Sequence, residues 1–171
     1  MKSHNGMRPQ DILILLKIVT LVDAKWQYRD LAAQLSISVS EISESLTRSH
    51  MAGLVDETRR RVHKQSLLEF IEHGLQYVFP QLPGTLITGT PTGHSHPFFK
   101  DKFESEENYV WADPQGTIRG LEILPLHKQV AVAARKDNTL YRLLACIDVI
   151  RIGRVREKNL ALTELKKHVL S

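Results

Sequence analysis

The sequence lacks the features that define disulfide-linked and membrane-spanning proteins. It has a single cysteine, Cys146, among 171 residues, which excludes a disulfide framework within the chain and is typical of a reducing compartment. The longest apolar run, residues 12–22, is interrupted by Lys17 and Thr20 and is shorter than the ~20 residues that span a bilayer. No basic stretch followed by an apolar run and a small-residue cleavage site marks a signal peptide. We therefore expect a cytoplasmic protein that does not bind a membrane.

The motifs of nucleotide, nucleophile and metal chemistry are also missing. The nine glycines form neither a GxGxxG nor a GxxxxGK[ST] loop, and GxSxG and HExxH are absent. His94 and His96, two positions apart, make at best half of a metal site, which Asp101 or Glu104 would have to complete. We prefer the interpretation that the loop 84–99 packs its two phenylalanines on the core. We therefore expect no enzyme, no metal and no cofactor.

Excess charge is small. The chain has 23 Lys and Arg against 19 Asp and Glu, a formal net charge of +4. A nucleic-acid site would therefore have to come from a local cluster of cations. One cluster exists, since Arg59, Arg60 and Arg61 are consecutive and His63 and Lys64 follow closely.

The spacing of apolar residues predicts an α+β protein. Inward positions at Leu31, Leu35, Ile42 and Leu46 predict two short helices, 28–35 and 38–52, and a capping box opens the second at Ser38. The expected order then continues with a charged hairpin over 54–63, a helix over 66–79 that a second capping box opens, a hairpin of strands 109–111 and 117–124, and helices over 130–135, 138–152 and 155–169, with breaks at Asp137 and Gly153.

Two predicted helices have apolar faces that another element must cover. Residues 12–22 leave almost no polar face, and a helix that is apolar all round must be covered on several sides. Burial within one monomer, a dimer interface and cover by the C-terminal segment all satisfy this demand. The apolar face of 138–152 similarly suits either the helix 66–79 of the same chain or a second copy. Basic residues near the last helix form either a solvated face or a second phosphate-binding strip: Arg151, Arg154, Arg156 and Lys158.

The segment YRDLAAQLSISVSEISESLTRSHMAGLV, residues 28–55, meets each demand of a helix-turn-helix in order. It has inward leucines, a small residue at Ala32, an apolar plug at Ile37 and a cap at Ser38. It resembles the winged helix-turn-helix proteins of the MarR-like bacterial regulator families over residues 10–65, although Ser36 stands where glycine is common. The resemblance implies a recognition helix and a basic wing, with DNA-contacting residues Ser38, Val39, Ser40, Ser43, Glu44, Thr47 and Arg48 on the helix and Arg59, Arg60, Arg61, His63 and Lys64 on the wing.

These predictions define three parts of the chain. Residues 1–65 are the winged helix-turn-helix, 66–83 a connecting or dimerisation helix, and 84–171 a smaller C-terminal part with a β-hairpin and helices that serves dimerisation or sensing. The expected function is a sequence-specific regulator, a repressor, that binds double-stranded DNA as a homodimer. Two alternatives stay open: a protein-interaction module such as an antitoxin-like partner of a neighbouring gene product, and a regulator that senses a small-molecule effector in a pocket between the two parts.

Overall fold

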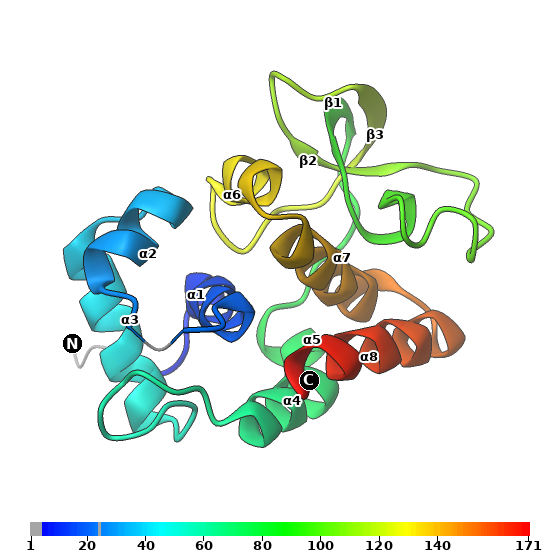
Figure 1. Cartoon of the computed structure of the whole chain (residues 1–171). Coiled ribbons are helices and arrows are strands. Elements are labelled where there is room, and N and C mark those ends of the chain that lie inside the picture. Colours follow the sequence, from blue (N-terminus) through cyan, green and yellow to red (C-terminus); the bar gives the residue numbers. More distant parts are fainter. Residues whose placement is uncertain (1–4, 24) are drawn as a thin grey trace.

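The α+β architecture is confirmed by the computed structural model, which describes residues 5–23 and 25–171 (Figure 1). Helices and a small sheet follow one another in the order α1 (Pro9–Thr20), α2 (Tyr28–Leu35), α3 (Val39–Met51), α4 (Lys64–His73), α5 (Leu75–Val78), β1 (Leu86–Pro91), the 3-10 helix η1 (Gly93–Ser95), β2 (Tyr109–Ala112), β3 (Ile118–Glu122), α6 (Val130–Lys136), α7 (Asn138–Ile152) and α8 (Val155–Val169). In the described ranges, no helix combines the length and the apolar character needed to cross a bilayer.

Helix α1 lies at the centre of the molecule. Pro9 occupies its first turn, and the five residues from Ile12 to Leu16 are completely buried. Helices α2 and α3 contact α1, and α7 and α8 of the same chain contact it as well (Figure 1). The C-terminal segment therefore covers α1 within one chain, and the burial of α1 requires no second copy.

Helix α7 is the second central element. It packs against α1, α4, α5, α6 and α8, so its apolar face is covered within the chain. The three predicted C-terminal helices are confirmed, with the breaks at Asp137 and Gly153. Asp137 caps α7 by accepting the backbone N–H of Leu140 at 3.0 Å, and it also binds Nζ of Lys17 on α1 at 2.7 Å. One carboxylate thus starts α7 and joins it to α1.

The predicted hairpin of two strands is wrong in its pairing. Strands β2 and β3 run parallel to each other, and β1 pairs antiparallel with both, which closes the three strands into a small barrel. Strand β1 lies in the segment 84–99, for which the sequence predicts a loop. A Cβ at Gly89 would lie 1.9 Å from the Trp111 carbonyl oxygen, so the backbones approach more closely here than any side chain allows.

The helix expected over 66–79 is two helices. Helix α4 begins at Lys64 with His63 as its N-cap, so Ser66 lies inside the helix and does not cap it. The first helix ends at Gly74, where a Cβ would lie 3.0 Å from the Phe70 ring. The charged hairpin before α4 is reduced to one bridge, between Val55 and Val62.

Candidate nucleic-acid interface

Helices α2 and α3 are joined by a tight turn. Ser36 ends α2 in the left-handed conformation, with φ 55° and ψ 43°, and the N–H of Ile37 donates to the Ala32 carbonyl at 3.1 Å. Ser38 then caps α3, because its Oγ accepts the N–H of Glu41 at 3.2 Å. The four inward residues that predicted this unit are completely buried: Leu31, Leu35, Ile42 and Leu46.

The N-terminal half of α3 presents a polar surface. Ser38, Val39, Ser40 and Glu44 are exposed, and Ser43 is half-buried. One turn further, Thr47 is also half-buried, and its hydroxyl donates to the Ser43 carbonyl at 3.0 Å. These six predicted residues therefore share a side of α3 that the rest of the chain leaves at least partly accessible, and this side carries no cation of its own.

Arg48 is placed differently from the prediction. Its side chain points into the protein and forms a two-pronged ion pair with Asp11, with Nε to Oδ2 at 2.9 Å and Nη2 to Oδ1 at 2.7 Å. Asp11 is completely buried, and its hydrogen bond is the main cause that raises the pKa of Arg48. The expectation that Arg48 is exposed is wrong because its position on α3 faces α1. Arg48 fastens α3 to α1.

The turn at the tip of the predicted hairpin is stabilised by Asp56. Its Oδ1 accepts the hydroxyl of Thr58 at 2.8 Å and the backbone N–H groups of Arg60 and Arg61 at 3.0 and 3.2 Å. Arg59 takes a positive φ of 59°, which such a tight turn requires. Burial would raise the pKa of Asp56, but these hydrogen bonds lower it on balance. We call residues 56–61 the arginine turn.

The three arginines of this turn have different surroundings. Arg59 reaches back to α3, where its Nη1 donates to Oγ1 of Thr47 at 2.9 Å. Arg60 lies over Trp26, with its guanidinium carbon 4.7 Å from the ring centroid, and donates to the Trp26 carbonyl. Arg61 is exposed. Arg61 and, in part, Arg59 are thus the cations that the arginine turn offers to a partner.

The remaining predicted basic residues also differ in how far they are exposed and in whether they bind other groups of the chain. On the wing, Nδ1 of His63 lies 2.9 Å from the Gly53 carbonyl, and Lys64 is half-buried in the first turn of α4. In the C-terminal strip, Arg151 is buried, which removes it from the surface, and Lys158 is half-buried and binds Gln76. Arg154 and Arg156 are exposed.

Three residues that organise this region were missed from the sequence: Asp11, Trp26 and Asp56. The spacing Asp56-x-Thr58 before a basic run is a recognisable turn signal. Asp11 and Trp26 had no such signal, because their partners Arg48 and Arg60 lie more than 30 positions away.

The histidine pair of the 84–99 loop is divided between two environments. Nε2 of His94 lies 3.1 Å from Glu157, whereas Nδ1 of His96 accepts the backbone N–H of Phe98 at 3.0 Å. Within residues 5–23 and 25–171, no group of three His, Cys, Asp or Glu side chains is arranged to hold a metal ion. Phe99 is completely buried, as expected for a loop that packs on the core.

His96 gives the fold a dependence on pH. Burial, aided by the charge of Arg142, lowers its pKa to about 4 in the folded protein, against ~6.5 in an unfolded chain. Between these two pH values the unfolded chain binds more protons than the folded protein. The stabilisation that comes from the neutral His96 is therefore fully present above pH ~6.5 and decreases as the pH falls. We expect a loss of about 2 kcal/mol in the free energy of unfolding from pH 7 to pH 5, measured by urea denaturation.

The control variants separate this effect from the general titration of the protein. His96→Asn keeps an acceptor for Phe98 and should flatten the pH slope, although the lowered pKa of His127 leaves a residual slope of the same sign. His73→Asn, at an exposed position of α4, should keep the full slope. An unchanged slope in His96→Asn would contradict the assignment.

Comparison with known proteins finds no match among family models, curated proteins or solved structures.

Proposed function

We propose that this protein is a sequence-specific regulator that binds double-stranded DNA, acting as a homodimeric repressor. One observation carries the proposal: the polar N-terminal side of α3 is accessible and lies directly beside the arginine turn, to which the contact between Arg59 and Thr47 ties it. A helix seated by a tight turn with a cationic loop at its side is the arrangement that places a helix in the major groove and a loop on the backbone.

Each part of this surface has a chemical role in the proposed complex. The hydroxyls of Ser38, Ser40 and Ser43 reach phosphates or base edges, and Glu44 accepts a hydrogen bond from a cytosine amine. Arg61, Arg59 and the N-terminus of α3 supply the positive potential toward the phosphates. Arg48 is paired with Asp11 and does not contact DNA in this proposal. The short polar side chains of α3 therefore recognise the base sequence, and the arginine turn supplies most of the affinity for DNA.

The small number of free cations favours a symmetric dimer on DNA. A monomer that neutralises only a few phosphates binds weakly, and a second copy on an adjacent half-site doubles the phosphate contacts. Light scattering should therefore give a dimer in the presence of the operator duplex, and a monomer with one-to-one stoichiometry would contradict this part of the proposal.

The test is a binding titration with the duplex upstream of the protein's own gene, at a series of salt concentrations. The double variant Arg59→Ala/Arg61→Ala should weaken binding and reduce the slope of log K against log salt by about 1 to 2 per protomer. The control Lys167→Ala, which removes one exposed cation of α8 outside the proposed surface, should leave both values unchanged. Absence of duplex binding at low salt would reject the proposal.

A protein partner is the second candidate, and one observation favours it. The accessible side of α3 combines the exposed Val39, whose exposed fraction is 49%, with the carboxylate of Glu44 and no cation. Such a mixed apolar and acidic surface suits a basic protein, including a toxin-like partner. Replacement of Val39 by Asp would abolish a protein contact, and co-purification with the neighbouring gene product measures it.

A further inference from the structure

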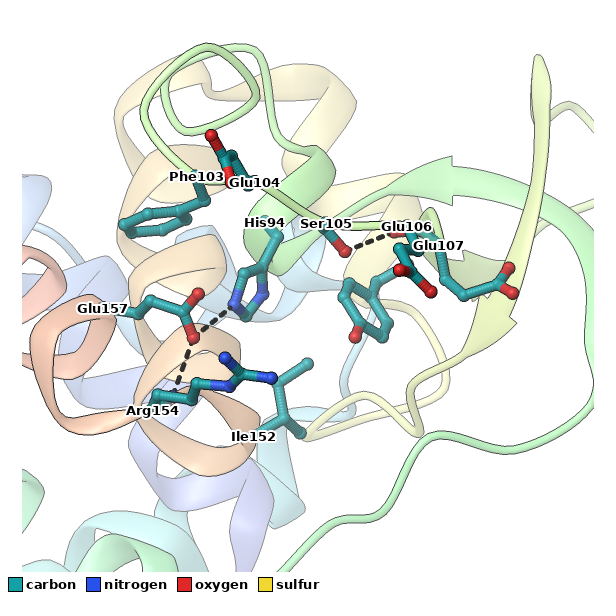
Figure 2. Close-up of a pocket in the computed structure, with 10 residues that line it drawn as sticks. His94, Phe103, Glu104, Ser105, Glu106, Glu107, Ile152, Arg154 and Glu157 are labelled. Carbon is teal, nitrogen blue, oxygen red and sulfur yellow. Dashed lines mark hydrogen bonds and ion pairs between the residues drawn. The ribbon is translucent and has the colours of Figure 1, made fainter.

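A cavity of about 810 Å³ lies between η1, the segment 103–109 and the start of α8, and no residue of α3 lines it (Figure 2). Its volume is in the range of sites that hold small organic ligands, ~300–1,000 Å³. Aromatic rings, one arginine and several carboxylates line the cavity. The lining residues include His94, Phe103, Glu104, Tyr109, Arg154 and Glu157. None of these residues belongs to the proposed DNA surface.

His94 in this cavity has an unused hydrogen-bonding atom. The side chain is held between the rings of Phe103 and Tyr109, with centroids 5.1 Å from each, and its Nε2 lies 3.1 Å from Oε1 of Glu157. The carboxylate favours the proton on Nε2, which leaves Nδ1 as an acceptor. Nδ1 is buried and has no partner within the described part of the chain. An unsatisfied buried acceptor is costly, so a donor from a ligand would stabilise this site.

The charged residues of the cavity lie in two places. Figure 2 shows the guanidinium of Arg154 beside Ile152 and Glu157, on the opposite side of His94 from Glu104. In residues 5–23 and 25–171 the Arg154 guanidinium donates no hydrogen bond, since only its backbone N–H is bonded, to Glu157 at 2.7 Å. Glu104, Glu106 and Glu107 are exposed at the edge of the cavity. The Arg154 guanidinium therefore has one carboxylate beside it, that of Glu157, and the three glutamates at the edge form a separate negative group.

We propose that this cavity binds a zwitterionic ligand of the free amino acid class. The ligand carboxylate pairs with the guanidinium fork of Arg154, which matches a carboxylate in two parallel hydrogen bonds. The ligand ammonium lies among the glutamates at the edge and donates to Nδ1 of His94. An apolar ligand side chain packs against Phe103 and Ile152. A simple anion would be repelled by the carboxylates, and a simple cation would leave Arg154 without a partner.

Calorimetric titration of the whole protein with L-phenylalanine, followed by the other standard amino acids, tests the proposal. Two analogues of L-phenylalanine remove one charge each: phenethylamine lacks the carboxylate and 3-phenylpropanoate lacks the ammonium. The amino acid should bind at least about tenfold more tightly than either analogue, because each analogue loses a charge-assisted pair. Arg154→Gln should weaken the amino acid at least about tenfold and leave phenethylamine unchanged.

The control variant is Arg119→Gln, an exposed arginine of β3 that does not line this cavity, and it should bind like the parent protein. Both substituted arginines are exposed, so neither change threatens the fold. Equal binding of phenethylamine and L-phenylalanine would overturn the proposal in favour of a cation site. Failure of every standard amino acid to bind would also overturn it. The measurement needs no DNA, so its outcome is independent of the proposed DNA binding.

Discussion

Replacing Arg48 by Met should lower the free energy of unfolding by about 3–5 kcal/mol, the cost of breaking a buried ion pair by removing one partner. The substitution leaves Asp11, which is completely buried, without its counter-ion and without two hydrogen bonds. It also removes the contact that fastens α3 to α1. Urea denaturation followed by circular dichroism measures the loss.

The double variant Asp11→Leu/Arg48→Met distinguishes an unpaired charge from a general loss of packing. An apolar pair of similar volume restores most of the stability when the penalty comes from the isolated carboxylate. Arg29→Met, at an exposed position of α2, provides the matched control and should change stability by less than about 0.5 kcal/mol. A loss below about 1 kcal/mol in Arg48→Met would contradict the structural role of the pair.

The same variant also separates structure from DNA contact. At a temperature where Arg48→Met remains folded, the salt dependence of duplex binding should equal that of the parent protein, because Arg48 neutralises no phosphate. A reduced salt slope in the folded variant would mean that Arg48 turns outward in the complex.

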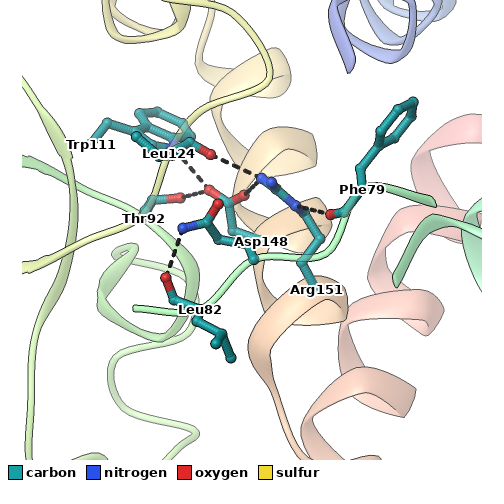
Figure 3. Close-up of polar contacts among 8 residues, drawn as sticks. Phe79, Leu82, Thr92, Trp111, Leu124, Asp148 and Arg151 are labelled. Carbon is teal, nitrogen blue, oxygen red and sulfur yellow. Dashed lines mark hydrogen bonds and ion pairs between the residues drawn. The ribbon is translucent and has the colours of Figure 1, made fainter. Parts of the chain in front are cut away.

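The second large effect is expected at Asp148, at the centre of the C-terminal half (Figure 3). Its carboxylate accepts the hydroxyl of Thr92 at 2.6 Å, the indole N–H of Trp111 at 2.8 Å and Nη1 of Arg151 at 3.1 Å. Arg151 in turn donates to the carbonyls of Phe79 and Leu124, each at 3.0 Å. This network ties α7 to η1, to β2, and to the segments that follow α5 and β3.

Asp148→Ala should cost about 3–5 kcal/mol, since it isolates a buried arginine and leaves two buried donors without an acceptor. Trp111 is a local probe, because its indole loses a partner and its fluorescence should change in the folded variant. Asp101→Ala, an exposed aspartate, is the control and should leave stability and fluorescence unchanged. A loss at Asp148 no larger than the loss at Asp101 would show that the network contributes nothing.

The sequence predicted the elements whose signals are local. The turn at Ser36, the cap at Ser38 and the breaks at Asp137 and Gly153 depend on neighbouring residues, and they appear where the pattern places them. The barrel could not be predicted, because β1 pairs with strands about 20 to 35 positions away, and its Gly/Thr-rich sequence is also typical of a loop.

The sequence also predicted part of the candidate site, but not the tertiary contacts of its arginines. Of the seven positions in 38–52 that the resemblance implies, six are at least partly accessible, whereas the position of Arg48 depends on a carboxylate 37 residues away. A run of three arginines indicates a cationic surface, but it does not reveal that Trp26 holds one of them. Charge patterns identify a region, and the number of charges free to bind depends on tertiary contacts.

The central position of α1 limits how this protein can be divided. A segment that ended after the arginine turn would expose the side of α1 that α7 and α8 cover, and it would leave Lys17 without Asp137. We therefore expect that the half that holds α3 and the arginine turn does not fold stably when it is separated from the C-terminal helices. A change in the C-terminal helices can reach α3 by two routes, because α7 and α8 contact α1, which packs on α3, and α6 contacts α2, which also packs on α3.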